Sequence, residues 1–285
     1  MLGNSATRFG AAFILWVTIA GSPARSQAPA YEVYAVNYAT APGRALSDLV
    51  AGADSTETID ISFMVWLLKG PAGRIILVDT GFRPDAPSAA SFGFEGYIRP
   101  DSAVAKLGVT PENVTDIVLT HMHWDHADGL DLFPNAHVWV QKAELEYHAA
   151  GAWQPDGSHL GIEPRDVVRL VELNTQGRVT LVDGDGLEII EGITAYTGAR
   201  HTYASQYLGV SVAGGTVVIA SDNVFVYANL DLHLPVTLTL DAEANIEAQD
   251  RMRQIASRPE WIIPGHDAAV FRRFPSPVAG VARIR

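Results

Sequence analysis

The segment LTHMHWDHADG, residues 119–129, decides how this sequence is interpreted. It places three histidines and two aspartates within eight positions, where the apolar run DIVLT at 116–120 ends. Imidazole and carboxylate groups gathered so densely are typical ligands of divalent metal ions. Chance is a poor explanation of a His-x-His-x-Asp-His pattern, because histidine accounts for only 9 of the 285 residues. The alternative is that these side chains cap a turn or pair on the surface.

The spacing within this segment predicts two metal ions. If the chain is still extended at His121 and His123, both rings point to the same face, where one cation can bind them. The chain then bends, and Asp125 and His126 can reach a second cation roughly 3.5–4 Å away, as in two-metal hydrolytic sites.

Four ligands are too few for two ions, so further ligands must come from other parts of the chain. Three candidates share a position just past an apolar strand: His201 after ITAYTG, Asp222 after TVVIAS and His266 after WIIPG. Loops at one edge of a sheet converge, and the strands hold them rigid. The chain has no cysteine, so every ligand must offer nitrogen or oxygen, and no disulfide can form.

Outward from this segment, the sequence predicts one continuous domain with two groups of strands. Strand patterns lie at 31–39, 61–68, 75–79, 116–120 and 136–141, and again at 178–183, 187–197, 206–213, 216–221 and 261–264. Helices are expected near 100–115, 142–149 and 242–257, with an irregular stretch at 151–164 that could cover a pocket. This order favours an α/β (α+β) fold in which two packed sheets are flanked by helices.

The first 28 residues are predicted to be a secretory signal peptide, with the mature domain at 29–285 and a periplasmic or secreted location. They combine a basic start, a short apolar run and a small-residue ending, SPARSQA. The alternative, a membrane anchor, needs about 20 apolar residues. Removing Arg8 and Arg25 leaves 18 basic and 32 acidic residues, a net charge of −14. Such a surface repels nucleic acid and anionic membranes, so we expect neither nucleic-acid binding nor stable membrane insertion; homodimer formation is left open.

Several motifs resemble the metallo-β-lactamase superfamily, and its N-acyl-homoserine lactonase branch most closely. They are HMHWDH at 121–126, VDTGF at 78–82, LFPNA at 132–136, HTYASQ at 201–206, ASDN at 220–223 and IIPGHD at 262–267. The resemblance implies an αββα sandwich of two mixed β-sheets. It also implies that one metal is held by His121, His123 and His201, and the other by Asp125, His126 and His266, with Asp222 bridging both.

The resemblance implies a metal-dependent hydrolase that opens the lactone ring of N-acyl-homoserine lactones, small molecules used in quorum sensing. Two divalent ions are expected, zinc by default, although cobalt, manganese or iron suits the same ligands. The alternatives are another hydrolase of the same fold, such as a glyoxalase II-like thioesterase, a β-lactamase or an esterase, and a non-catalytic metal-binding protein. Two β-lactamase subclasses use a cysteine ligand and the third lacks the bridging aspartate, which disfavours that activity here.

In the expected mechanism a hydroxide bridging the two metals attacks the lactone carbonyl, and Asp125 passes the proton to the leaving oxygen. Two departures from the lactonase pattern concern substrate binding. Phe225 stands where lactonases have a tyrosine that contacts the carbonyl, and Tyr227 is the candidate replacement. The usual Gly-His-Thr-Pro-Gly reads Arg-His-Thr-Tyr-Ala at 200–204. The residues expected to form an apolar wall for an acyl chain are Met122, Trp124, Trp153, Phe225 and Leu234.

Overall fold

The computed structural model describes residues 1–4 and 30–285. The predicted signal peptide lies outside these residues except for its first four, and it stays a prediction. Within the described ranges, no helix combines the length and apolarity that crossing a bilayer requires.

The larger of two sheets has seven strands in the spatial order β12-β1-β2-β3-β4-β5-β6. β1, β2 and β3 pair antiparallel, whereas β3, β4, β5 and β6 run parallel to one another. β12 adds to the free edge of β1 in antiparallel register. The bounds are β1 Glu32–Ala45, β2 Thr58–Lys69, β3 Ile75–Val78, β4 Asp116–Val118, β5 His137–Gln141, β6 Val179–Val182 and β12 Val281–Arg283.

The smaller sheet has five strands in the order β11-β10-β9-β8-β7. β10 and β11 are parallel, and the other neighbours are antiparallel. Both sheets are therefore mixed. The bounds are β7 Leu187–Ile190, β8 Ile193–Tyr196, β9 Tyr207–Val212, β10 Gly215–Ser221 and β11 Ile262–Pro264.

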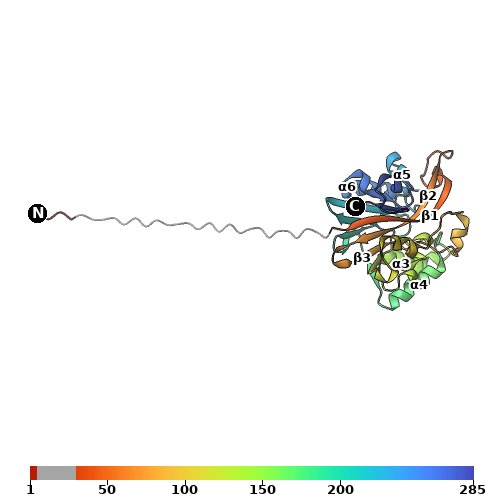
Figure 1. Ribbon diagram of the computed structural model, residues 1–285, viewed down its shortest axis with the longest axis horizontal. Coiled ribbons are helices and arrows are strands. Elements are labelled where there is room, and N and C mark those ends of the chain that lie inside the picture. The colour runs from red at the N-terminus through yellow and green to blue at the C-terminus, as the bar shows by residue number, and fades with distance from the viewer. Residues whose placement is uncertain (5–29) are drawn as a thin grey trace.

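Helices cover the outer faces of the two sheets. Figure 1 shows α3 and α4 on one side of the strands and α5 and α6 on the other. The predicted αββα sandwich is thereby confirmed. The helices are α1 Pro100–Val104, α2 Trp124–Ala127, α3 Lys142–Ala149, α4 Pro164–Thr175, α5 Tyr227–Leu232, α6 Ala242–Ile255 and α7 Val270–Arg273.

The core has layers because successive side chains of a strand face opposite ways. In β2, Val65 and Leu67 belong to the cluster between the larger sheet and its helices. Trp66 and Leu68 belong to the cluster between the two sheets. All four are fully buried, which explains why this strand is apolar without alternation. Each such Val or Leu stabilises the fold by roughly 1.5–3 kcal/mol.

Two predicted elements are wrong in extent. The single helix expected at 100–115 ends early: α1 stops at Val104, a 3-10 turn follows, and Gly108 takes a left-handed φ of 73°. The strand expected at 187–197 is a hairpin, β7 and β8, which turns at Gly192 with φ 80°. In both places a glycine adopts backbone angles that other residues avoid.

Several elements were not predicted from the sequence, among them α4, α5, α7 and β12. Helix α4 begins at Pro164, a favourable first helical residue, and buries Val167, Leu170 and Leu173. Helix α5 follows the Asp222 loop, and β12 comes after β11, which was expected to be the last strand. The helical spacing of the buried residues in α4 was a usable signal.

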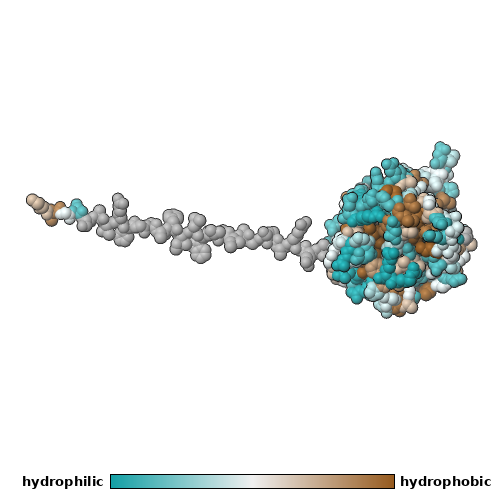
Figure 2. All heavy atoms as spheres, turned by 90° about the horizontal axis from the view of Figure 1, so that it is seen from above, coloured by the Kyte–Doolittle hydropathy of each residue, from teal (hydrophilic) through white to brown (hydrophobic). Residues whose placement is uncertain are grey.

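Hydrophilic and hydrophobic residues are both exposed on the surface (Figure 2). Figure 2 shows one face, where hydrophilic residues surround a smaller group of hydrophobic ones near the centre. Exposed apolar residues include Leu160, Leu238 and Leu240, which lie in loops.

Candidate metal centre and active site

The four ligand candidates of the central segment lie where β4 gives way to α2. His121 follows the strand, His123 takes the N-cap position, and Asp125 and His126 lie in the first turn of α2. The segment is pinned by a hydrogen bond of 2.9 Å from Trp124 N to Gly161 O. The bend expected after His123 is therefore the start of a helix.

One group of side chains consists of His121, His123 and His201 with Asp222. Nδ1 of His123 lies 3.1 Å from Nε2 of His121 and 2.9 Å from Nε2 of His201. Oδ2 of Asp222 lies 3.8 Å from Nε2 of His121 and 3.4 Å from Nε2 of His201. These ligand atoms all lie within 4.8 Å of one another.

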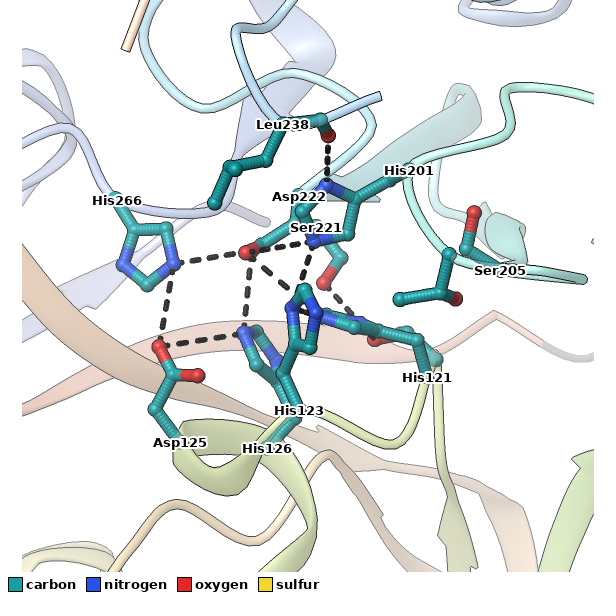
Figure 3. Close-up of polar contacts among 12 residues, drawn as sticks. His121, His123, Asp125, His126, His201, Ser205, Ser221, Asp222, Leu238 and His266 are labelled. Atoms are coloured by element: carbon teal, nitrogen blue, oxygen red, sulfur yellow. Dashed lines mark hydrogen bonds and ion pairs between the residues drawn. The ribbon is translucent and has the colours of Figure 1, made fainter. Parts of the chain in front are cut away.

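A second group consists of Asp125, His126 and His266, again with Asp222. Oδ2 of Asp125 lies 3.6 Å from Nε2 of both histidines. Oδ1 of Asp222 lies 3.2 Å from Nε2 of His126 and 3.0 Å from that of His266. Asp222 thus turns one oxygen to each group, and Figure 3 shows it between them. The structure brings together all seven residues, in the two sets that the resemblance implied.

Outer hydrogen bonds set the tautomers of these histidines. Nδ1 of His201 donates to the carbonyl of Leu238 at 2.6 Å, and Nδ1 of His266 to that of Ser62 at 3.2 Å. A carbonyl can only accept, so in the neutral ring Nε2 faces the group as a lone pair. Nδ1 of His126 has the same relation to Asp79, at 2.8 Å. Metal-binding histidines are usually held in this way.

Asp79 connects several parts of the centre, although the sequence analysis assigned it no role. It is fully buried and accepts hydrogen bonds from the backbone N and Oγ1 of Thr120, and from Oγ of Ser221. Its φ is +60°, and that of Ser221 is +49°. Such backbone strain is concentrated at functional sites. Asp79 follows the apolar strand β3, so the rule that found His201 could also have found it.

Two glycines let the chain approach the ligands closely. A Cβ atom at Gly265 would lie 2.5 Å from Oδ1 of Asp222. A Cβ atom at Gly161, where φ is +72°, would lie 2.9 Å from Cδ2 of His123. Any larger residue would displace a ligand.

The side chains present fit two divalent cations. Nε2 of His126 and Oδ1 of Asp222 are buried and form no hydrogen bond among the described residues. Buried polar atoms without partners are costly, and a metal ion is one way to satisfy them. Nitrogen and oxygen donors of this kind suit zinc, cobalt, manganese or iron.

The two groups differ in the electrostatics of their side chains. Burial, together with neighbouring histidines, holds the pKa of His121 and His123 well below the usual value. Burial also lowers the pKa of His201. Burial is the largest single effect on His126 and His266 and opposes their protonation, but the neighbouring carboxylates, Asp222 first and then Asp125, together outweigh it and raise the pKa of both. The first group is thus made of neutral imidazoles, and the second is dominated by carboxylates.

A family model decides which family this centre represents. The model of the Metallo-beta-lactamase superfamily matches residues 63–266, more than half of the chain, and this range holds all seven ligand candidates. The chain belongs to the metallo-beta-lactamase superfamily. The resemblance noted in the sequence is confirmed at this level.

Curated relatives of this superfamily member include N-acyl homoserine lactonases. One from Bacillus sp is 26% identical over 225 residues, which is 74% of this chain and 83% of the relative. One from Bacillus cereus is 24% identical and covers 81% of this chain and 92% of its own. A metallo-beta-lactamase domain-containing protein 1 from Mus musculus is 31% identical over 70% of this chain and 61% of the relative.

Solved structures share the fold of this metallo-beta-lactamase domain. A quorum-quenching N-acyl homoserine lactone lactonase superposes with a TM-score of 0.68 at 19% identity, covering 86% of this chain and 96% of that one. A dizinc quorum-quenching lactonase in complex with a product superposes with a TM-score of 0.63 at 15% identity, covering 90% and 91%. At such identities the likeness establishes the fold.

A cavity of about 550 Å³ opens over the metal ligands. It is bordered by His123, Asp125, His201, Asp222 and His266, members of both ligand groups. Four aromatic side chains that also line it, here called the aromatic wall, are Phe63, Phe92, Trp124 and Phe225. The cavity therefore combines a polar, metal-binding floor with an apolar side.

The rings of the aromatic wall contact one another and the ligands. Phe63 lies 5.8 Å from both Phe92 and Trp124 between ring centroids, and 5.5 Å from the ring of His266. Phe225 meets the ring of His201 edge-on at 5.3 Å. Edge-to-face contacts of this kind fix ring positions. Phe63 both packs in the core and lines the cavity.

Of the five residues expected to bind an acyl chain, Trp124 and Phe225 line the cavity, and the other three do not. Met122 is fully buried in the helix-side core. Leu234 packs against that core, and Trp153 stacks on His159. From the irregular stretch 151–164, Leu160 and Gly161 border the cavity instead.

Tyr227 lies apart from the metal ligands. Its side chain is buried in the core between the sheets, and the guanidinium of Arg273 sits 3.6 Å from its ring centroid. It borders a different hollow, with Leu230, Arg253 and Arg273. The structure therefore gives no geometric support for its expected role as replacement for the missing tyrosine, because α5 turns this ring away from the cavity.

Glu144 is a further buried carboxylate that sequence analysis missed. Its Oε1 accepts from Met122 N at 3.1 Å and from Oγ1 of Thr202 at 2.7 Å, and Oε2 accepts from Ala204 N at 2.7 Å. It joins the segment between His121 and His123 to the loop that follows His201. An acid on a helix carries no sequence signal for such long-range contacts.

Proposed function

We propose that this protein is a metal-dependent hydrolase that opens the lactone ring of N-acyl homoserine lactones. The observation that carries this proposal is the arrangement of seven ligands in two groups sharing Asp222, beneath a cavity of about 550 Å³ with an aromatic wall. The related lactonases support the choice of substrate, because lactonase is the activity named for several curated relatives. An acylated lactone fits this arrangement, with its ring over the polar floor and its chain along the apolar side.

His121, His123 and His201 would hold one ion, and Asp125, His126 and His266 the other, with Asp222 shared. Two bound ions supply Lewis acidity and lower the pKa of water. Zinc is the ion we propose, and elemental analysis of protein purified without chelator tests that choice.

Asp125 is positioned to carry a proton. It borders the cavity, and only one of its two oxygens takes part in the contacts drawn with His126 and His266 (Figure 3). Burial raises the pKa of this carboxyl group above its usual value. Its second oxygen can therefore take a proton at the attacking side and deliver it to the departing alkoxide.

Phe225 offers no hydroxyl to the substrate carbonyl, and Tyr227 is directed elsewhere. In this chain the wall residue Phe225 instead packs edge-on against the ring of His201 and, tilted, against that of His266. It can contribute apolar contact with the substrate.

The proposal is tested by offering metal-loaded protein N-acyl homoserine lactones of several chain lengths, a thioester and a cephalosporin in a pH-stat assay. We expect ring opening of the lactones, with much slower cleavage of the other two. If the lactones stay closed while the thioester is cut, the substrate assignment is wrong.

We further propose that the protein is exported to the periplasm or secreted. The support is the amino-acid pattern of residues 1–28. Fractionation of cells and sequencing of the mature N-terminus test it, with a start at Pro29 expected.

A further inference from the structure

We propose that Arg44 binds a carboxylate at the far end of the substrate's acyl group, an inference that rests on the proposed lactonase function. Arg44 lies near the end of β1, and its side chain lines the cavity above the metal ligands. It is the only lysine or arginine among the described residues that line this cavity. Its side chain is about one third exposed.

The guanidinium of Arg44 lacks a close acceptor among the described residues. Its Nε is buried and donates no hydrogen bond to any described residue. The carboxylate nearest to Nη2 is that of Asp48, at 3.9 Å, which is too long for a hydrogen bond. A cation without a close carboxylate favours an anionic ligand, and the exposed third of this side chain is where a ligand in the cavity can reach it.

Other arginines of the chain show what this edge binds when it is occupied. Arg74 places Nε and Nη2 on the two oxygens of Asp116 at 2.9 and 3.1 Å. Arg99 does the same with Asp101 at 2.7 and 2.6 Å. The Nε and Nη2 fork matches the geometry of a carboxylate. The side chain of Arg44 lines the cavity, and its guanidinium has no carboxylate of the described residues within hydrogen-bond distance.

Aromatic rings lie between Arg44 and the metal ligands. The guanidinium carbon of Arg44 is 5.3 Å from the ring centroid of Phe92. Phe92 contacts Phe63, and Phe63 contacts His266. An acyl chain whose lactone ring lies over the ligands can therefore follow these rings and end at Arg44. The ligand class is an N-acyl homoserine lactone whose chain ends in a carboxylate.

The net charge of the protein would by itself disfavour a substrate that ends in a carboxylate. The chain has an excess of 12 acidic residues and repels anions in general, so a higher kcat/KM for an anionic substrate requires a cationic side chain close to that anion. Asp48 also lines the cavity and weakly competes for the guanidinium.

The test compares homoserine lactones of equal acyl length, with and without a terminal carboxylate, on the metal-loaded protein. The pairs are N-hexanoyl and N-adipoyl, N-octanoyl and N-suberoyl, and N-decanoyl and N-sebacoyl homoserine lactone. The methyl ester of each terminal carboxylate serves as the uncharged control. We expect kcat/KM for the carboxylate to exceed that for its ester about tenfold or more at one chain length. Arg44→Met should abolish this preference and leave turnover of the unsubstituted lactones within about twofold. Asp48→Asn should increase the preference. Arg258→Met removes an arginine that also stacks on an aromatic ring, Trp261, but lies outside the cavity lining, and it should change nothing.

A binding measurement separates this inference from the lactonase proposal. Calorimetry measures the affinity for ring-opened N-suberoyl homoserine and for its methyl ester at the end of the acyl chain. Comparing wild type with Arg44→Met gives the contribution of Arg44 to binding without any turnover. If no lactone is opened but carboxylate binding depends on Arg44, the lactonase proposal fails and the Arg44 assignment stands. If lactones are opened but wild type shows no carboxylate preference at any chain length, or Arg44→Met retains it, the assignment is overturned.

Discussion

The metal-ligand floor and the aromatic wall border the same cavity, but different interactions hold them. Each floor histidine except His123 has an outer nitrogen fixed by a hydrogen bond, and Asp79 and Glu144 tie the loops that carry them. The wall is held by ring contacts, and its residue Phe92 is only partly buried. Hydrogen-bonded ligands tolerate little displacement, whereas packed rings can be exchanged for others of similar volume.

This difference indicates a division of roles. We propose that the floor carries out the metal-dependent hydrolysis and that the wall selects among substrates. Changes in the floor should therefore reduce turnover of every substrate, whereas changes in the wall should alter preference among substrates. The following predictions test that division.

The largest effect is expected for Asp222→Ala, because this carboxylate belongs to both ligand groups. We expect loss of bound metal and a fall in kcat of about 10³-fold or more, comparable to removing a preorganised group that stabilises the transition state. Elemental analysis and ring-opening rates provide the measurement. Asp183→Ala, which removes only an exposed ion pair with Lys142, is the control. Unchanged metal content and rate in Asp222→Ala would refute the shared-ligand assignment.

Asp125→Asn separates metal binding from proton transfer. The amide can still offer an oxygen to the second ion but cannot carry the proton, so kcat should fall about 10²-fold, a typical loss for a general acid. Metal content must be measured on the same sample. A variant that holds two metals and runs at the wild-type rate would exclude the proton-transfer role.

Glu144→Gln tests the support of the floor. An amide can accept only part of the hydrogen bonds from Met122, Thr202 and Ala204, so His123 and His201 should be less well held, with a loss of about tenfold in metal affinity. Competition with a chelator measures it. Glu146→Gln, on the exposed side of the same helix, is the matched control. Equal affinities in the two variants would contradict the role of Glu144.

Asp166 lies beside a network of ionic contacts in which Arg83 and Arg165 bind Asp128, and substituting Asp166 tests how this network depends on pH. Burial, reinforced by Asp128, raises the pKa of Asp166 to about 8. A folded-state pKa above the unfolded value means that stability is fully present below about pH 4 and declines as the pH rises through about 8. The variant Asp166→Asn lacks this titrating group. Between about pH 5 and pH 9, the free energy of unfolding of the wild type should therefore fall by on the order of 1 kcal/mol or more compared with that of the variant. Urea unfolding at both values measures it, and parallel behaviour of the two proteins would contradict it.

Phe225→Tyr should have the smallest effect. It adds one hydroxyl beside His201 and His266 without removing the ring, so one additional hydrogen bond to substrate would raise kcat/KM by about threefold to tenfold. Phe225→Leu, which keeps an apolar side chain and removes the ring, should change the preference among acyl chains more than it changes kcat. If Phe225→Leu instead abolished turnover of all lactones, the division between floor and wall would fail.

How much could be predicted from the sequence differs between these two regions. The floor was predictable because metal binding requires particular residue types, because His121, His123, Asp125 and His126 are close together in the sequence, and because His201, Asp222 and His266 lie in the loops that follow apolar strands. Asp79 obeys the same rule but was overlooked as a participant. Glu144 was not predictable, because nothing in its local sequence indicates that a helix would carry it to the loops of Met122 and Thr202.

Of the four wall residues, the sequence predicted Trp124 and Phe225 but not Phe63 and Phe92, because a sequence does not show which way an apolar side chain points. Met122 and Trp124 are near neighbours in sequence, yet the start of α2 turns Trp124 toward the cavity and leaves Met122 in the core. Apolar side chains serve equally as core or as pocket lining, and composition does not distinguish the two.

The sequence by itself predicted two packed sheets flanked by helices and the seven ligand candidates, because these depend on residue type and on position relative to strands, and its motifs resembled a superfamily whose members imply the αββα sandwich and a bridging Asp222. Only the tertiary structure decided which oxygen of Asp222 faces which group, that Tyr227 lies in the core, and that Arg44 reaches the cavity. Those facts arise from contacts between segments far apart in the chain, and the direction of a side chain across such contacts is set by packing.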